Sequence, residues 1–116
     1  MTGAPDPVVE AAAVAAADRV DPSGKLRGDV LAALHSTDRT ADRYSEIVDI
    51  AALVVAVATF VWTVVQARRT KAEPPPKPEV VARRIRVEFP LADNISPQQR
   101  DLIVDVVVER ILAEER

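Results

Sequence analysis

The feature that most constrains this chain is an unbroken apolar run at residues 50–65, which reads Ile-Ala-Ala-Leu-Val-Val-Ala-Val-Ala-Thr-Phe-Val-Trp-Thr-Val-Val. Its sixteen residues include no charge, glycine or proline. A helix that is apolar on every side must lie either in lipid or inside a large core. The chain has only 116 residues and 3% aromatics, so a large core would have to be built from small Ala and Val side chains. We therefore expect a single transmembrane helix.

The length and the flanks of the run agree with a membrane span. Residues 47–65 contain one charge, Asp49, and as a helix they measure about 28 Å, close to the roughly 30 Å thickness of the hydrocarbon core. Residue types typical of the membrane interface stand near the two ends: Tyr44, Trp62, Arg68 and Arg69. The alternative is a buried central helix in a soluble helical assembly. An interfacial helix is disfavoured because the run lacks a strong polar face.

Charge asymmetry predicts the orientation of the span. Seven basic and two acidic residues lie between residues 68 and 86, which gives a formal charge of +5. Before the run, Arg39 and Arg43 are offset by four acidic residues. Because basic residues are retained on the cytoplasmic side, the C-terminal segment is expected there. The predicted location is thus the cell membrane, crossed once, with a cytoplasmic C-terminus.

The small and polar residues of the run gather on one side. At about 100° per residue, one stripe holds Asp49, Ala52, Ala56, Thr59 and Thr63. Small residues let two helices approach closely, and Thr or Asp can hydrogen-bond across the contact. The stripe predicts a helix-association face and a homo-oligomer. Asp49 is also explained by interfacial water, because it lies near the amino end of the span.

The chain divides into four segments. Residues 1–43 form an N-terminal helical region, with helices expected at 7–20 and 26–34 and a break at 21–24. The transmembrane helix occupies residues 44–67. Residues 68–79 form a basic, proline-rich spacer, in which four prolines within five residues enforce an extended polyproline II conformation. Residues 80–116 form a strand–helix interaction module.

The last module has clear local signals. Residues 84–89 alternate polar and apolar side chains, which predicts a strand. Ser96 and Gln99 fit a capping box, and Pro97 stands at the first position of the helix that follows. The apolar side chains of the strand and the helix are the predicted partner or oligomer interface: Ile85, Val87, Phe89, Leu102, Ile103, Val106, Val107 and Ile111.

This module cannot be complete by itself. A single strand has two unpaired edges, and about 37 residues bury too little apolar surface to fold alone. We expect a second copy or a protein partner on the cytoplasmic side to complete it. The predicted fold is therefore mainly α, with short N-terminal helices, one transmembrane helix and a small β-α unit completed by oligomerisation or a partner.

The sequence offers little chemistry for catalysis or ligand binding. It contains one His and no Cys, and its three glycines form no phosphate-binding loop. We predict no enzymatic activity, no catalytic residue, no metal site and no cofactor. A net charge of -3 is also too mild to indicate a nucleic-acid partner for the whole chain.

The layout resembles small membrane-anchored accessory proteins of actinobacterial conflict and defence operons. The resembling stretch runs from Glu46-Ile47-Val48-Asp49-Ile50 through Trp62 to Arg68-Arg69, and includes the Arg-rich segment that follows. The resemblance covers about half the chain, contains no diagnostic motif and supplies no catalytic residue. It implies an adaptor that places effectors at the membrane.

The sequence leaves three functions open. The first is a non-enzymatic, single-pass membrane anchor or adaptor, with the lipid bilayer, further copies of itself and a cytoplasmic protein as partners. The second is a membrane-permeabilising protein of the holin or effector type, whose apolar helix oligomerises through its stripe. The third is a soluble helical structural component in which residues 47–65 form a buried assembly helix.

Overall fold

The computed structural model describes residues 6–35, 50–89 and 95–114, and these residues are mainly helical. The helices are α1 (Pro7–Val20), α2 (Lys25–Leu34), α3 (Ile50–Thr70), α4 (Pro78–Glu88) and α5 (Pro97–Ala113). The described ranges contain no strand. The mainly α class, both N-terminal helices and the long apolar helix are confirmed, whereas the β-α unit is not supported.

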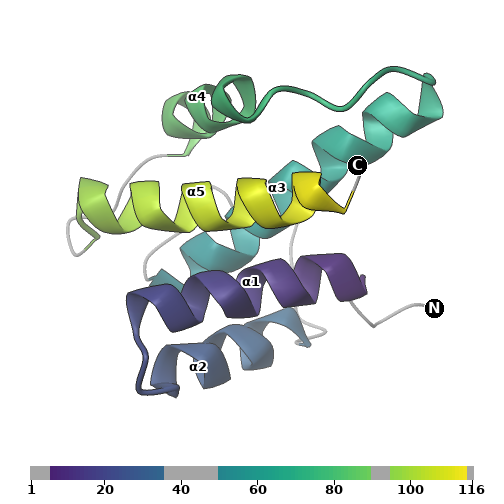
Figure 1. Ribbon diagram of the computed structural model, residues 1–116. Coiled ribbons are helices and arrows are strands. Elements are labelled where there is room, and N and C mark those ends of the chain that lie inside the picture. The colour runs from purple at the N-terminus through teal and green to yellow at the C-terminus, as the bar shows by residue number, and fades with distance from the viewer. Residues whose placement is uncertain (1–5, 36–49, 90–94, 115–116) are drawn as a thin grey trace.

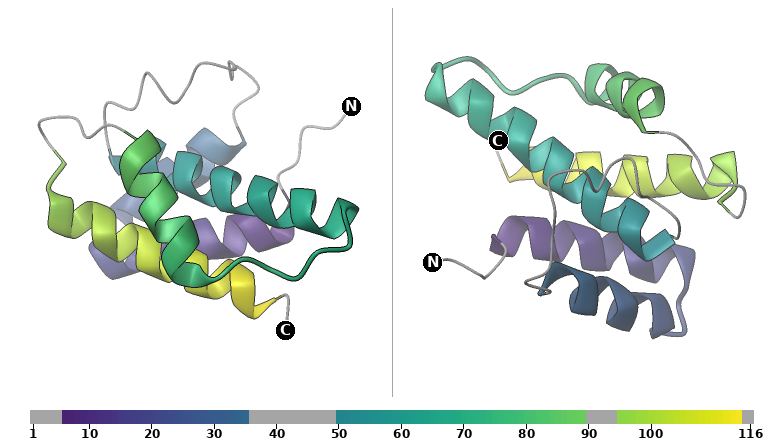
Figure 2. Two further views of the ribbon diagram at one scale, coloured as in Figure 1. Left: turned by 90° about the horizontal axis from the view of Figure 1, so that it is seen from above. Right: turned by 180° about the vertical axis from the view of Figure 1, so that it is seen from behind.

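The helices are stacked around one apolar core. In Figure 1, α2, α1, α5 and α4 succeed one another from bottom to top, and α3 crosses behind them. The view from behind in Figure 2 places α3 on the opposite side of the bundle, where it packs on α1, α2 and α5. Helix α4 packs mainly on α5 at the upper edge. The basic end of α3 and the whole of α4 therefore share that edge.

Helix α1 fits between α2 and α5 because its buried face is made of alanine. Ala12, Ala13, Ala16 and Ala17 are completely buried. Their spacing places them on one side of the helix, where side chains this small let neighbouring helices approach closely. The helix begins after Asp6, whose carboxylate accepts a hydrogen bond from the Val8 backbone N–H at 2.9 Å.

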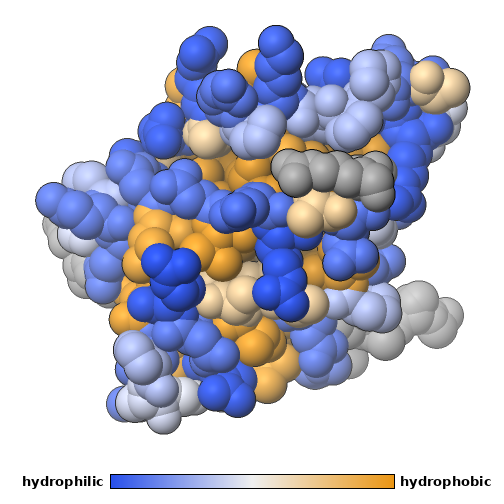
Figure 3. Space-filling view, in the orientation of Figure 1, coloured by the Kyte–Doolittle hydropathy of each residue, from blue (hydrophilic) through white to orange (hydrophobic). Residues whose placement is uncertain are grey.

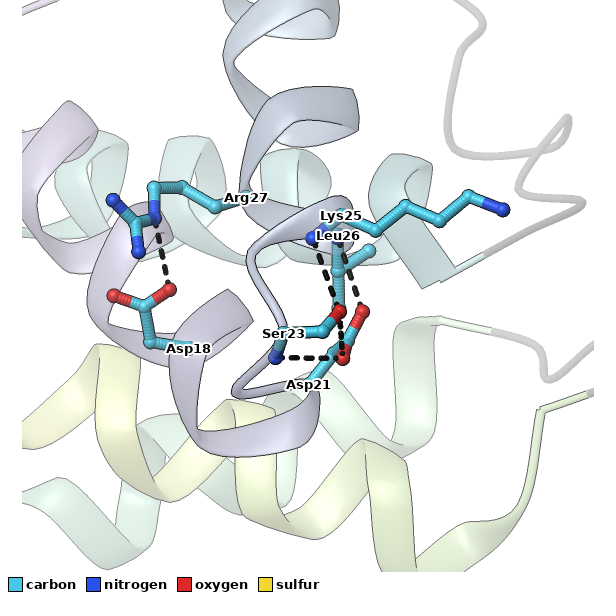
Figure 4. Close-up of polar contacts among 6 residues, drawn as sticks. All are labelled: Asp18, Asp21, Ser23, Lys25, Leu26 and Arg27. Carbon is cyan, nitrogen blue, oxygen red and sulfur yellow. Dashed lines mark hydrogen bonds and ion pairs between the residues drawn. The ribbon is translucent and has the colours of Figure 1, made fainter.

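A carboxylate organises the turn between α1 and α2 (Figure 4). Asp21 Oδ1 accepts hydrogen bonds from the Ser23 N–H at 3.1 Å and the Ser23 hydroxyl at 2.7 Å, and Oδ2 accepts one from the Leu26 N–H at 3.2 Å. These bonds hold the pKa of Asp21 below its ordinary value, the Ser23 hydroxyl having the largest effect. Gly24 has φ +95°, a left-handed conformation that glycine adopts at little cost.

The strand predicted at residues 84–89 is wrong, because residues 78–88 form helix α4. Ile85 and Phe89 are buried, as the alternation predicted, but Val87 between them is 79% exposed. The buried residues follow helical spacing instead: Val81, Ala82 and Ile85 lie on one face, and Phe89 closes the C-terminal end. Pro78, at the first helical position, begins a helix that the short alternating pattern concealed.

The predicted C-terminal helix is present as α5, and its capping box is confirmed. The Gln99 N–H donates to the Ser96 hydroxyl, and the Ser96 N–H donates to the Gln99 side chain, both at 3.1 Å. The apolar face of α5 does not need a second copy of the chain to bury it. It is covered by α1, α3 and α4 of the same chain.

Candidate membrane helix and basic edge

Helix α3 is the candidate functional element. It is 21 residues long, about 31 Å at roughly 1.5 Å per residue. Among the described residues it is the one helix long and apolar enough to cross a membrane, a test that the core helix of a soluble protein also passes. Half of its most apolar window is buried in the bundle. Six consecutive residues, 53–58, are buried, and these cover the whole circumference of the helix.

The predicted association stripe runs along the least covered side of α3. Ala52 and Thr59 are half-buried and Thr63 is exposed, whereas Ala56 is completely buried. The Thr63 hydroxyl donates a hydrogen bond to the Thr59 carbonyl oxygen at 2.8 Å. The stripe is thus partly accessible, and its amino end, Asp49, lies outside the described residues.

The C-terminal end of α3 carries the predicted interface residues. The Arg69 guanidinium stacks on the half-buried Trp62 ring, with its carbon 5.4 Å from the ring centroid. Arg68 lies beside Glu73 at 3.7 Å and donates to the Pro74 carbonyl at 3.2 Å. Tyr44, at the other predicted interface, is outside the described residues.

A Schellman turn ends α3 and sets the direction of the proline segment. The Glu73 N–H donates to the Arg68 carbonyl at 2.8 Å, and the Ala72 N–H donates to the Arg69 carbonyl at 3.0 Å. Ala72 has φ +58°, which is unfavourable for a residue with a Cβ atom. The turn redirects the chain, so that α4 returns along the upper edge of the bundle (Figure 1).

The basic residues of the proline segment and of α4 complete this edge. Arg84 pairs with Glu88 at 3.4 Å, and its guanidinium carbon lies 5.3 Å from the centroid of the Phe60 ring. Arg86 pairs with Asp101 of α5 at 3.3 Å. Figure 3 shows hydrophilic side chains projecting along the upper edge of the molecule, with hydrophobic atoms among them. We call the basic side chains of residues 68–86 the basic edge.

The predicted partner interface is mostly internal. Ile85, Phe89, Ile103, Val107 and Ile111 are buried within the chain. Leu102 and Val106 are half-buried, so of this set only Val87 is fully open to solvent. The outward face of α4 escaped sequence reasoning because it becomes visible only once residues 78–88 are recognised as a helix. The signal was present as the helical spacing of Val81, Ile85 and Phe89.

Within the described ranges, no group of three or more His, Cys, Asp or Glu side chains is placed to hold a metal ion. No family model, no curated protein and no solved structure matches this chain. The arrangement of its own residues is therefore the basis for assigning a function.

Proposed function

We propose that this protein is a non-enzymatic, single-pass membrane adaptor, with α3 as its anchor and the C-terminal segment on the cytoplasmic side. One observation carries the proposal: α3 combines the length of a membrane span with an uncharged sequence from Ile50 to Ala67 and a basic end. The charge of +5 between residues 68 and 86 favours a cytoplasmic C-terminus.

Two of the hydroxyl-bearing side chains of α3 are compatible with lipid. The hydroxyl groups of Thr63 and Thr70 donate to the carbonyl oxygens four residues earlier, at 2.8 and 3.0 Å. A polar group in the hydrocarbon core is costly when its hydrogen bond is unmade. Because these two donors are satisfied inside the helix, they impose no such cost. The partial accessibility of the stripe, at Ala52, Thr59 and Thr63, also supports association of two anchors.

Anchoring requires that α3 exchange its neighbours in the bundle for lipid. Asp18 and Arg27 form an ion pair at 3.0 Å on α1 and α2, and both side chains are exposed. Asp105 and Glu109 are exposed on α5. These charges make it costly to bring the outer helices into lipid together with α3. In this proposal, the chain forms the helical bundle in water. In a membrane, α3 leaves the bundle and crosses the bilayer.

Carbonate extraction of membranes from cells that express the full chain tests this proposal. A span remains in the pellet, and this is the expected result. A protein held only by charge is released into the supernatant, which would contradict anchoring by α3. A variant with Val57→Asp is the matched control, since a charge at mid-helix opposes insertion by about 3 kcal/mol.

The second candidate is a soluble helical component in which α3 is the core helix. Burial of all six residues from 53 to 58 favours it. The radius of gyration, 13.4 Å, is also about that of a compact soluble domain of this length. This candidate predicts recovery of the chain in the soluble fraction before any extraction.

A further inference from the structure

We propose that the outward face of α4 binds the surface of an anionic lipid bilayer. This face consists of Val80, Arg83, Arg84 and Val87, whose spacing places them on one side of the helix. The inference extends the proposed membrane function but does not depend on α3 crossing the bilayer, since a surface contact and a span are separate events.

The two valines are the observation that needs an explanation. Val80 is 45% exposed and Val87 is 79% exposed, and they are the only exposed large hydrophobic side chains in the described part of the chain. They lie seven residues apart, two turns along the same face. The opposite face of α4 already holds the contacts with the core through Val81 and Ile85. Val87 in particular is therefore not needed to hold α4 on the bundle.

Positive charge lies between the two valines. Arg83 is exposed, and within the described residues it forms no ion pair, although it lines a cavity between α4 and α5 together with Asp105 and Glu109. Arg84 is 57% exposed, although it is paired with Glu88 and its guanidinium also lies over the Phe60 ring of α3. A short helix with valines and arginines on one side suits the boundary between headgroups and acyl chains, where apolar groups enter and guanidinium groups bind phosphate.

The charge of the molecule is segregated in a way that favours this orientation. Residues 68–86 carry +5, whereas the whole chain carries -3, so the remaining residues carry -8. Anionic lipid attracts the basic edge and repels the rest of the molecule. Because the end of α3 lies at the same edge, contact by α4 also holds Arg68 and Arg69 near the headgroups (Figure 1).

The test uses the full chain, which contains no cysteine, so one introduced cysteine can carry a polarity-sensitive dye. The dye is attached at Val87→Cys, and a control dye at Ala11→Cys on the exposed side of α1. Each protein is combined with phosphatidylcholine vesicles, with or without phosphatidylglycerol. We expect a blue shift of the dye at residue 87 with anionic vesicles only, reversed by high salt, and no shift at residue 11.

Charge reversal provides the matched comparison. Arg83→Glu removes two units of charge from the face and is expected to weaken the attraction about 30-fold, which abolishes the shift. Arg19→Glu makes the same change at an exposed position of α1 and should leave the shift unchanged. The absence of a blue shift at residue 87 with both kinds of vesicle overturns the inference. An acidic protein would then be the better candidate to bind this face.

The result is separable from the test of α3. A chain that resists carbonate extraction but shows no shift at residue 87 retains its anchor and lacks the surface contact. A chain that shows the shift and is released by carbonate has the surface contact without the span.

Discussion

The edge of the Phe89 ring faces the Phe60 ring, with the ring centroids 5.4 Å apart and the ring planes at 75°. The contact joins the end of α4 to the middle of α3, and the Phe89 side chain is 2% exposed. Arg84 lies against the same Phe60 ring. Phe60 is therefore a residue of α3 that contacts both Phe89 and Arg84 of the α4 segment.

We predict that Phe89→Ala destabilises the bundle in water by about 3 kcal/mol, because it removes a buried ring and leaves a cavity against Phe60. Urea unfolding followed by circular dichroism measures the change. Val87→Ala, on the exposed face of α4, should change the free energy of unfolding by less than about 0.5 kcal/mol. Equal losses for the two variants would contradict the described packing of α4.

Replacing Ala72 with glycine should stabilise the end of α3. Ala72 occupies the left-handed position of the Schellman turn with φ +58°, where a Cβ atom is unfavourable. We expect Ala72→Gly to raise the free energy of unfolding by about 1 kcal/mol in the same assay. Ala11→Gly, at a solvent-exposed position within α1 and away from its ends, should lower the free energy of unfolding by about 1 kcal/mol. Opposite signs for the same substitution identify the turn as the cause.

The turn after α1 should lose stability in acid. The pKa of Asp21 is lowered by its hydrogen bonds with Ser23, so the ionised carboxylate stabilises the folded state. Its contribution is present above the ordinary pKa of about 4 and is lost as the pH falls through the lower folded value. We therefore expect Asp21→Asn to be less stable than the parent at neutral pH and the difference to shrink below about pH 4. A difference independent of pH would rule out the carboxylate as its source.

The capping box of α5 gives a prediction of similar size. Ser96→Ala removes the acceptor of the Gln99 N–H and leaves the Ser96 N–H bond with the Gln99 side chain in place. We expect a loss of about 1 kcal/mol in thermal or urea unfolding. Ser96→Thr retains a hydroxyl at the cap and should recover most of it. An unchanged stability for Ser96→Ala would show that α5 is held by packing alone.

Comparison of α5 with α4 explains what the sequence could and could not predict. The start of α5 depends on residues three apart, Ser96 and Gln99, so it is readable locally. The assignment of α4 depended on a six-residue alternation, which is too short to distinguish a strand from a helix. Ile85 and Phe89 are four residues apart and satisfy both patterns. The burial of the adjacent Val81 and Ala82 favours the helix, and so does the packing of Phe89 on Phe60, a contact that spans 29 residues of sequence.

The sequence also could not predict which helices bury the apolar face of α5. Ile103, Val107 and Ile111 predict a buried face but do not identify what buries it. The alanine face of α1 supplies much of that cover, although nothing in an alanine stripe identifies its neighbour. The apolar run was the easier feature, since its length and its uncharged sequence depend on no distant contact.

The accessibility of residue 56 to a maleimide tests the central claim, that α3 crosses the membrane, most directly. Ala56 is completely buried in the bundle, and the chain has no other cysteine to label. Membranes containing the Ala56→Cys protein are treated with the reagent in urea and then in urea with detergent. We predict no labelling until detergent removes the lipid, while Ala11→Cys is labelled at every stage. Labelling of residue 56 in urea alone would show that only the bundle protected it, and would contradict the claim.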